Sequence, residues 1–381
     1  MANRKIKLGV DAKWYFKGPP SGMVVVKHLV DELVTKTGHI DLYLFIDKAA
    51  IAEAREVFNK EGITLIPVKA NPNLLSNFFL IPHYSNKYLL DIILMQNFVS
   101  LLPVKAVNGL YIHDVLFLDF PQYFTRTELL YYKFMRAFAK KADFIIAISD
   151  SEKNRLIKHN MGTEKNIHVV HHGISEKFKP LIEYPEDEIK RFDEKYKLPQ
   201  KYLLYVGRLN IRKNLFNLVN ALKFINDKDI QLIIAGEEQF KNSNIAQYLQ
   251  ENNLEERVKF MGHVPQEDLY LIYAKAYIFC FPSYAEGFGL PPLEAMRCGV
   301  PAIVSDRTSL PEVCGDAGIY IDPDNPTDIA EKLNTLIEDE YFYAVKSAQS
   351  IKQAKQFTWQ KAGDLLFSTI TSYYDSRKDN S

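Results

Sequence analysis

The segment FPSYAEGFGLPPLEAMRCG, residues 281–299, constrains the fold of this chain more than any other segment. The apolar run that precedes it, residues 277–281, is typical of a buried strand. Pro291 and Pro292 fit the first turn of a helix, and Gly299 fits the end of one. The segment therefore predicts a strand, a glycine-rich loop and a short helix in immediate succession.

Two carboxylates and two glycines occupy this predicted loop and helix. Glu286 is expected where the strand ends, and Glu294 on the first helical turn. Gly287 and Gly289 let the backbone approach a ligand closely, and the amides of a helix N-terminus bind phosphate. Because carboxylates accept hydrogen bonds from hydroxyl pairs, the segment predicts a site for a phosphorylated sugar.

Simpler interpretations of the same residues exist. Glu294 could only favour the helix dipole, and Glu286 could be a solvated loop charge. A dinucleotide site is a further alternative, because Gly287 and Gly289 follow a strand and open a helix. However, Pro292 stands where the third glycine of that fingerprint belongs, and the motif lies far from the first strand of the chain.

A second motif places cations at a predicted strand end. Residues 202–206 form an apolar run, and Gly207, Arg208 and Lys213 follow it. The carboxyl ends of strands in open α/β sheets are where ligands bind. Arg and Lys there could stabilise the charge of a departing diphosphate; the alternative is two solvated loop cations.

Together these motifs resemble the retaining glycosyltransferases of family four, which have a B-type fold of two Rossmann-like domains. The resemblance runs from Phe281 to Pro323 and includes the paired glutamates. It implies that Glu286 contacts the donor sugar and that Glu294 binds the ribose hydroxyls. It also implies that Arg208 and Lys213 hold the donor's phosphates, and that the loop around the glycines, Gly287, Phe288, Gly289 and Leu290, contacts the donor.

The resemblance extends to the N-terminal half. His113 follows a predicted strand, at a position where the family has a histidine near the reacting sugar. Gly22 resembles the glycine that faces the donor's phosphates, although the family usually has Gly-x-Gly-Arg there and this chain has Ser21-Gly22-Met23-Val24. Trp14 could stack on an acceptor sugar or be buried in the core.

Composition and alternation set the fold class. At 381 residues the chain predicts two domains, and 47 Lys plus Arg against 47 Asp plus Glu leave no net charge to attract nucleic acid. Strand-like and helical runs alternate, as in doubly wound parallel sheets. We expect an α/β fold with an acceptor-side domain over residues 1–178 and a donor-binding domain over residues 179–355. Residues 356–381 are expected to form a helix that crosses back to the first domain and then a disordered tail from Asp375.

The predicted function is transfer of a hexose from a nucleotide-diphosphate-sugar to a glycan or lipid-linked acceptor with retention of configuration. The resemblance to polysaccharide-assembly mannosyltransferases makes mannose from GDP-mannose the first expectation. No metal and no cofactor are expected, because Asp322 and Asp324 lie in a turn rather than in a metal motif. A sugar-nucleotide epimerase or phosphorylase of the same fold, or a catalytically silent sugar-binding protein, are the rival interpretations.

The predicted location is the cytoplasm, with peripheral contact to the inner face of the membrane. The chain begins without a secretory apolar region. The helix expected over residues 128–141 combines lysines and an arginine with aromatic residues, and such a face can rest on anionic lipid. The ordinary alternative is a solvated helix face packed on the core.

Overall fold

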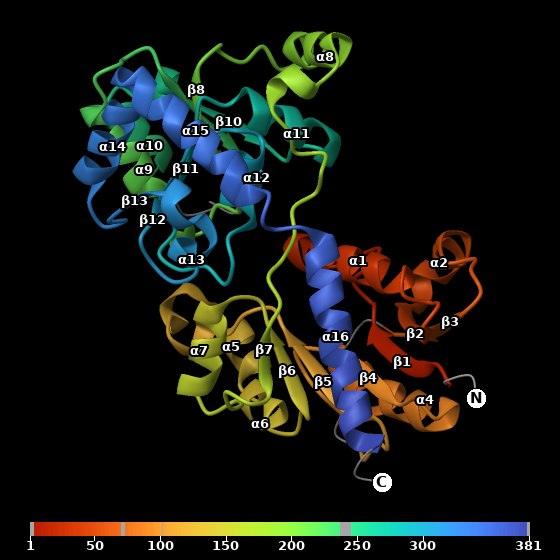
Figure 1. The fold of residues 1–381 in the computed structure, drawn as a ribbon. Coiled ribbons are helices and arrows are strands. Elements are labelled where there is room, and N and C mark those ends of the chain that lie inside the picture. The colour runs from red at the N-terminus through yellow and green to blue at the C-terminus, as the bar shows by residue number, and fades with distance from the viewer. Residues whose placement is uncertain (1–3, 70–72, 101, 237–244, 379–381) are drawn as a thin grey trace. The chain divides into compact units, whose positions relative to one another are not determined.

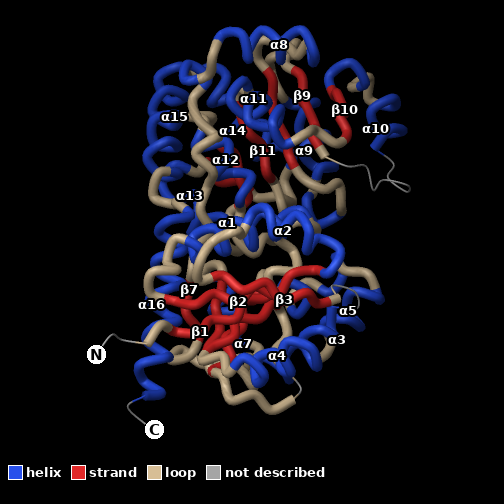
Figure 2. Tube along the Cα trace, turned by 90° about the vertical axis from the view of Figure 1, so that its right-hand side faces the viewer, coloured by secondary structure: helices blue, strands red, loops and turns tan. Residues whose placement is uncertain are grey.

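The computed structural model describes residues 4–69, 73–100, 102–236 and 245–378. Their contacts divide the chain into two compact units, Met1–Gly173 with Trp359–Ser381, and Ile174–Thr358. Each unit contains a parallel sheet with helices packed around it (Figure 1, Figure 2). The predicted α/β fold with two Rossmann-like parallel-sheet domains is confirmed.

The described residues of the N-terminal unit form a seven-stranded sheet in the order β3-β2-β1-β4-β5-β6-β7. Every pairing is parallel, and Leu8 of β1 lies between Leu42 of β2 and Ile92 of β4. These strands are almost continuously apolar because helices cover both faces of a parallel sheet. The strands are β1 (Ile6–Asp11), β2 (Ile40–Asp47), β3 (Ile63–Val68), β4 (Ile92–Gln96), β5 (Val107–Ile112), β6 (Phe144–Ala147) and β7 (Ile167–Val169).

Helices connect these strands and complete the N-terminal unit. They are α1 (Pro20–Val34), α2 (Ile51–Val57), α3 (Asn73–Leu75), α4 (Ile81–Tyr88), α5 (Arg126–Tyr132), α6 (Met135–Ala139), α7 (Asp150–Lys158) and α16 (Trp359–Lys378). The last of them returns from the end of the chain and packs on α1. Trp359 stacks on His28 with ring centroids 4.6 Å apart, and Gly363 lets α16 approach the Glu32 side chain so closely that a Cβ would not fit.

The C-terminal unit repeats the architecture with six described strands in the order β10-β9-β8-β11-β12-β13. All pairings are again parallel; Leu203 of β8 pairs with Ile278 of β11. The strands are β8 (Tyr202–Val206), β9 (Gln231–Ala235), β10 (Val258–Gly262), β11 (Ile278–Phe281), β12 (Ala302–Ser305) and β13 (Ile319–Ile321). The helices are α8 (Glu186–Tyr196), α9 (Leu215–Ala221), α10 (Ile245–Glu251), α11 (Gln266–Lys275), α12 (Leu290–Arg297), α13 (Leu310–Cys314), α14 (Pro326–Glu338) and α15 (Glu340–Ala354).

Each sheet reverses its strand order at one point, and this point locates the candidate site. In the N-terminal unit β1 lies beside β4, and in the C-terminal unit β8 lies beside β11. Ligands of open α/β sheets bind beyond the carboxyl ends of the strands at such reversals. Arg208 follows β8 and Glu286 follows β11, so both belong to the reversal of the C-terminal sheet.

The structure differs from the sequence-based expectations in several local details. Because α12 begins at Leu290, Glu294 lies on its second turn rather than its first. The single helix expected over residues 128–141 is two shorter helices, α5 and α6. The division between the units falls at Gly173 and Trp359 instead of residues 178 and 356. Asp375 to Lys378 continue α16, where a disordered tail was expected; the rest of that tail lies outside the described residues.

Candidate functional site

Glu286 is the centre of a buried ion-pair cluster in the C-terminal unit. The residue is only 7% exposed. The Lys213 ammonium lies 2.7 Å from Oε1, and the Arg212 guanidinium lies 3.1 Å from Oε2. Lys213 also lies 4.6 Å above the ring of Phe281, the last residue of β11. Two cations from the segment after β8 therefore hold the carboxylate that follows β11.

The ionisation of this cluster follows from burial and neighbouring charge. Burial alone would raise the pKa of Glu286, but Arg212 and Lys213 outweigh it and lower the pKa to about 2. Burial lowers the pKa of Lys213 to about 8, with Arg212 and Arg208 adding to the effect and Glu286 opposing it. At neutral pH the carboxylate is ionised and Lys213 remains mostly protonated.

The cluster carries more positive than negative charge. Arg208 is exposed, and among the residues that the structure describes no carboxylate lies within salt-bridge distance of it. It is nevertheless close enough to lower the pKa of Lys213. Three cations thus accompany one carboxylate, and the excess charge can attract an anionic ligand such as a diphosphate.

Short polar contacts fix the backbone around these side chains. Asn210 accepts a hydrogen bond from the Lys213 amide at 3.1 Å and caps the 3₁₀ turn Ile211–Lys213. Asn214, in a left-handed conformation with φ 55°, donates to the backbone oxygens of Pro282 at 3.0 Å and Pro323 at 2.6 Å. The loops after β8, β11 and β13 are therefore tied together.

Two hydroxyl residues after β12 hold the loop that carries Glu286. Thr308 accepts a hydrogen bond from the Glu286 amide at 2.9 Å. Ser309 donates to the backbone oxygens of Glu286 at 3.0 Å and Phe288 at 2.6 Å. Gly289, at φ 125°, has a conformation that L side chains rarely adopt, and a Cβ there would meet Leu310 at 2.9 Å. Gly287, Phe288 and Gly289 are all buried in this loop.

Glu294 occupies a different environment from Glu286. It lies half-buried on α12, and among the described residues no cation is within salt-bridge distance of it. Burial raises the pKa of its carboxyl to about 7, and the nearby Tyr273 phenol opposes the rise. That phenol does not reach hydrogen-bond geometry with any described group. The carboxyl group consequently retains capacity to bond a ligand hydroxyl.

The N-terminal unit brings His113 and Gly22 together. A Cβ placed on Gly22 would lie 2.9 Å from the Trp14 ring and 3.9 Å from Cε1 of His113. The Trp14 and His113 rings themselves have centroids 5.2 Å apart. Gly22 lies on the first turn of α1, which follows β1, and His113 directly follows β5. Trp14 is half-buried against these residues, whereas Tyr15 is buried and donates to Asp31 at 2.6 Å.

Glu286, Lys213 and Arg208 were expected at strand ends, and they lie in the segments that follow β11 and β8; their closest partners were overlooked. Arg212 was not assigned a role, although it directly precedes Lys213 in the same motif. Gln96, which hydrogen-bonds His113 at 2.7 Å, was also missed. The available signal was that Gln96 is a polar residue at the end of a strongly apolar strand.

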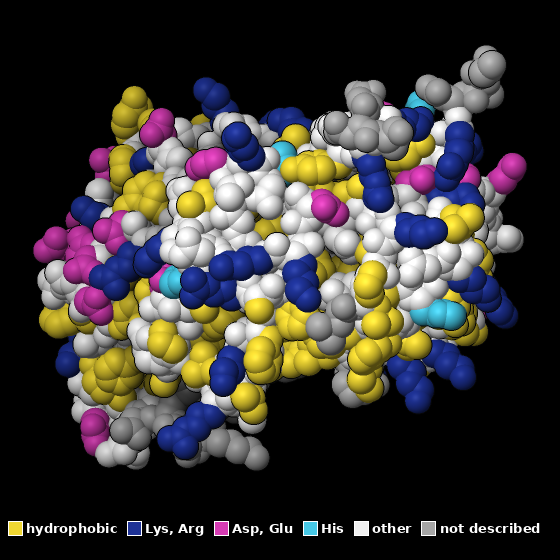
Figure 3. Space-filling model, turned by 90° about the horizontal axis from the view of Figure 1, so that it is seen from below, with side chains coloured by type: hydrophobic (Ala, Val, Ile, Leu, Met, Phe, Trp, Pro, Cys, Tyr) yellow, Lys and Arg dark blue, Asp and Glu magenta, His cyan; other side chains and the backbone are white. Residues whose placement is uncertain are grey.

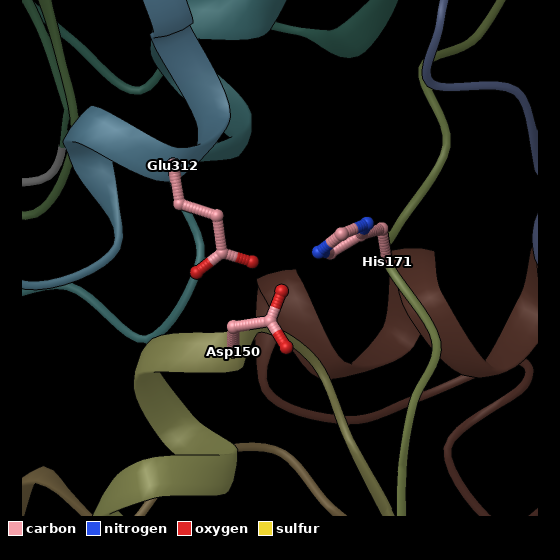
Figure 4. A group of neighbouring side chains, drawn as sticks. All are labelled: Asp150, His171 and Glu312. Carbon is pink, nitrogen blue, oxygen red and sulfur yellow. The ribbon is translucent and has the colours of Figure 1, made fainter.

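The acidic residues considered as metal ligands have other partners. Asp322 and Asp324 lie 3.0 and 2.6 Å from the Arg307 guanidinium. Figure 4 draws Asp150, the first residue of α7, and His171, which follows β7 in the same unit. The third side chain drawn, Glu312 of α13, belongs to the other unit. Within either unit taken by itself, the described residues therefore bring no more than two of these three side chains together.

The chain belongs to family four of the glycosyltransferases. Residues 186–357 match the family described as Glycosyl transferases group 1, and residues 23–178 match Glycosyltransferase Family 4. The O-antigen chain mannosyltransferase B of Escherichia coli is 32% identical over 266 residues, which are 68% of each chain. The resemblance inferred from the motifs is confirmed.

Further relatives are also mannosyltransferases by name. The serotype-specific mannosyltransferase WbdA of E. coli is 30% identical over 63% of this chain, but the match covers only 30% of that longer protein. The O-antigen chain mannosyltransferase RfbU of Salmonella typhimurium is 27% identical over 59% of each chain.

Solved structures share the fold at low sequence identity. A sucrose-phosphate synthase from Thermosynechococcus elongatus superposes with a TM-score of 0.75 at 19% identity, covering 98% of this chain and all of that one. HepE of Anabaena, in complex with UDP, has a TM-score of 0.72 at 20% identity, covering 97% of this chain and all of that one. Within the described residues, no helix combines the length and the apolarity needed to cross a bilayer.

Proposed function

We propose that this glycosyltransferase moves a hexose from a nucleotide-diphosphate-sugar to a glycan or lipid-linked acceptor in surface-polysaccharide assembly, with retention and without a metal ion. The observation that carries the proposal is the excess of positive charge around Glu286. A binding-only protein would not need three cations beside one carboxylate, whereas a reaction that releases a diphosphate does.

The proposed reaction uses these groups in distinct roles. The bond between the anomeric carbon and the diphosphate oxygen breaks, and the acceptor oxygen bonds to the same face of that carbon. The acceptor's proton passes to the departing phosphate. Arg208 and Lys213 neutralise the charge that develops on the diphosphate, and Arg212 keeps Glu286 ionised and oriented. Glu286 orients and stabilises the sugar.

Further roles are proposed for Glu294 in the C-terminal unit and, separately, for residues of the N-terminal unit. The Glu294 carboxyl would accept hydrogen bonds from the ribose hydroxyls, and Gly22 would admit the phosphates to the first turn of α1. His113 would contact a hydroxyl of the reacting sugar. The largely buried loop Gly287, Phe288, Gly289 and Leu290 would lie against the donor and exclude water from it.

Mannose from GDP-mannose is the proposed donor. The supporting observation is that O-antigen mannosyltransferase B, WbdA and RfbU are all mannosyltransferases by name. Because HepE was solved with UDP, the shared fold alone does not select the base.

The N-terminal unit also offers a surface for peripheral contact with an anionic membrane, where a lipid-linked acceptor would be found. A cavity of about 260 Å³ is lined by apolar and aromatic side chains: Leu74, Phe78, Phe98, Tyr131, Phe134 and Phe138. Lys133 lies 5.9 Å from the Phe134 ring, and Lys141 lies 5.7 Å from the Phe138 ring. Lys and Arg side chains lie among hydrophobic ones on the face in Figure 3. Cations beside an apolar cavity suit an anionic lipid headgroup and its chain.

Thermal-shift measurements with GDP-, UDP-, ADP- and dTDP-sugars test the donor, followed by a transfer assay with the stabilising sugar nucleotide. The expected result is stabilisation by GDP-mannose and product with a retained anomeric configuration. Epimerisation of a UDP-sugar without acceptor would replace the proposal with an epimerase. Binding without turnover against a panel of glycan acceptors would favour a silent sugar-binding protein.

A further inference from the structure

We propose that Gln96 is a positioning residue that fixes the tautomer of His113, so that the imidazole offers the sugar a hydrogen-bond acceptor at Nδ1. The consequence for the substrate rests on the proposed function, but the tautomer can be tested without any reaction. Gln96 is the last residue of β4, next to both β1 and β5, and is 5% exposed.

The two ends of the Gln96 amide have different partners, and this determines its orientation. One end lies 2.7 Å from Nε2 of His113, and the other donates to the backbone oxygen of Asp11 at 3.4 Å. A backbone oxygen can only accept, so the amide nitrogen must face Asp11. The amide oxygen then faces the imidazole and can only accept as well. Nε2 of His113 must therefore carry the proton.

The backbone on both sides of Gln96 is held in place. Asn77 donates to the backbone oxygens of Gln96 at 3.2 Å and of Phe98 at 3.1 Å. Asn97, with φ 61°, accepts a hydrogen bond from the His113 amide at 3.4 Å. These contacts fix the end of β4 and the start of the His113 loop relative to each other. The amide could reverse only by placing two oxygens face to face at Asp11.

The other ring nitrogen remains available as an acceptor. Among the described residues, no group hydrogen-bonds to Nδ1 of His113, and the ring edge at Cε1 faces Gly22 on α1. Burial lowers the pKa of His113 to about 4, so the ring is neutral at pH 7. Three titratable neighbours of the ring have partners of their own. Asp11 pairs with Lys13 at 2.9 Å, Tyr111 hydrogen-bonds His172 at 3.0 Å, and the adjacent Asp114 accepts from the Leu116 amide at 3.4 Å.

A neutral imidazole with this tautomer selects the chemistry of its partner. Nδ1 can accept from a hydroxyl, but it has no proton to give to a carboxylate or a phosphate. We therefore infer that His113 recognises a sugar hydroxyl and disfavours a donor sugar that carries an acidic group at that position. Specificity of this kind arises because an unpaired buried polar group is costly.

The experiment measures the imidazole ¹⁵N chemical shifts of His113 in the full-length protein, assigned with His113→Asn. The wild type should show a protonated Nε2 and an unprotonated Nδ1. Gln96→Leu should give a mixture of tautomers and lower kcat about tenfold, as expected for one lost neutral hydrogen bond. Gln231→Leu, on β9 of the other unit, is the matched control and should change neither the His113 tautomer nor kcat.

A second variant separates positioning from packing. Gln96→Glu retains an acceptor and adds a carboxylate, and an opposite charge raises the pKa of a histidine. The variant should keep the wild-type tautomer. Because the pKa of His113 is higher, the fall in activity on acidification should begin about one pH unit or more above that of the wild type. If Gln96→Leu does not fold, the wild-type shifts and Gln96→Glu decide the question.

Three outcomes would overturn the inference: a protonated Nδ1 in the wild type, an unchanged tautomer in folded Gln96→Leu, or an unchanged pH profile in folded Gln96→Glu. Failure of the proposed function has a different signature. Absence of transfer with every donor would refute the reaction, whereas the ¹⁵N shifts would still report the tautomer.

Discussion

Replacing Lys213 by alanine should separate stabilisation of the reaction from stabilisation of the fold. The Lys213 ammonium lies 2.7 Å from Glu286, and the Arg212 guanidinium lies 3.1 Å from it. With an effective dielectric constant of about 20, these distances correspond to attractions of about 6 and about 5 kcal/mol. Removing Lys213 also removes a desolvation penalty of several kcal/mol, and Arg212 continues to compensate the carboxylate.

The net loss of folding stability should therefore be about 1–3 kcal/mol. For a unit of this size that corresponds to a Tm decrease of roughly 3–10 °C. The effect on turnover should be larger, because the leaving diphosphate loses a cation in the transition state. A loss of about 3–4 kcal/mol there lowers kcat roughly a hundredfold to a thousandfold.

Initial rates at saturating donor and thermal unfolding of the same preparations measure the two effects. Lys352→Ala is the matched control, because Lys352 is an exposed lysine on α15. If the Lys213→Ala protein is folded and its kcat lies within tenfold of the wild-type value, the role assigned to this ammonium is refuted. A collapse of the fold would show instead that Arg212 does not compensate Glu286.

The remaining predictions concern the two glutamates, metal dependence, pH and lipid. Glu286→Ala should mainly lower kcat, whereas Glu294→Ala should mainly raise the KM for the donor, because each lost hydrogen bond to the ribose is worth roughly 1.5–3 kcal/mol. A change in KM alone for Glu286→Ala would contradict these roles. Transfer should persist fully in excess EDTA, and loss that magnesium or manganese restores would contradict a metal-independent reaction. Burial raises the pKa of Glu294 from 4.5 to about 7, so its contribution to stability is present below pH 4.5 and is lost as pH rises to about 7. Urea titrations at pH 4.5 and 8 measure this as a difference in the free energy of unfolding of up to about 3 kcal/mol, and Glu294→Gln should remove the difference. The protein should sediment with anionic vesicles at low salt and less at high salt, since each Lys or Arg near the lipid surface contributes about 1 kcal/mol of binding free energy. Absence of binding at low salt would show that the surface around the apolar cavity is an ordinary solvated face.

The strands and the candidate residues at their ends were readable from the sequence. Buried parallel strands are mostly apolar, so β4 and β8 stand out in the sequence as apolar runs. A charged residue in the loop that follows the carboxyl end of such a run lies near the ligand-binding edge of the sheet. For this reason the amino-acid pattern alone places Glu286 and Arg208 at that edge.

Helix limits were less predictable, because they depend on packing more than on local sequence. The helix expected over residues 128–141 is interrupted between Tyr132 and Met135, although the residues there carry no proline or glycine. Helix α16 extends through Asp375, beyond the last residue of its apolar pattern. Tertiary packing overrides propensity in such places.

Only the tertiary structure decided which of these side chains act on one another. Lys213 and Glu286 are far apart in the sequence, and their contact exists because β8 and β11 are neighbours in the sheet. In the N-terminal unit, Gln96 contacts His113 because β4 and β5 are neighbours in the sheet. The sequence determined which residues stand at strand ends because burial is a local pattern. Strand order determined their partners and pKa values, because these depend on distances in space that no local pattern encodes.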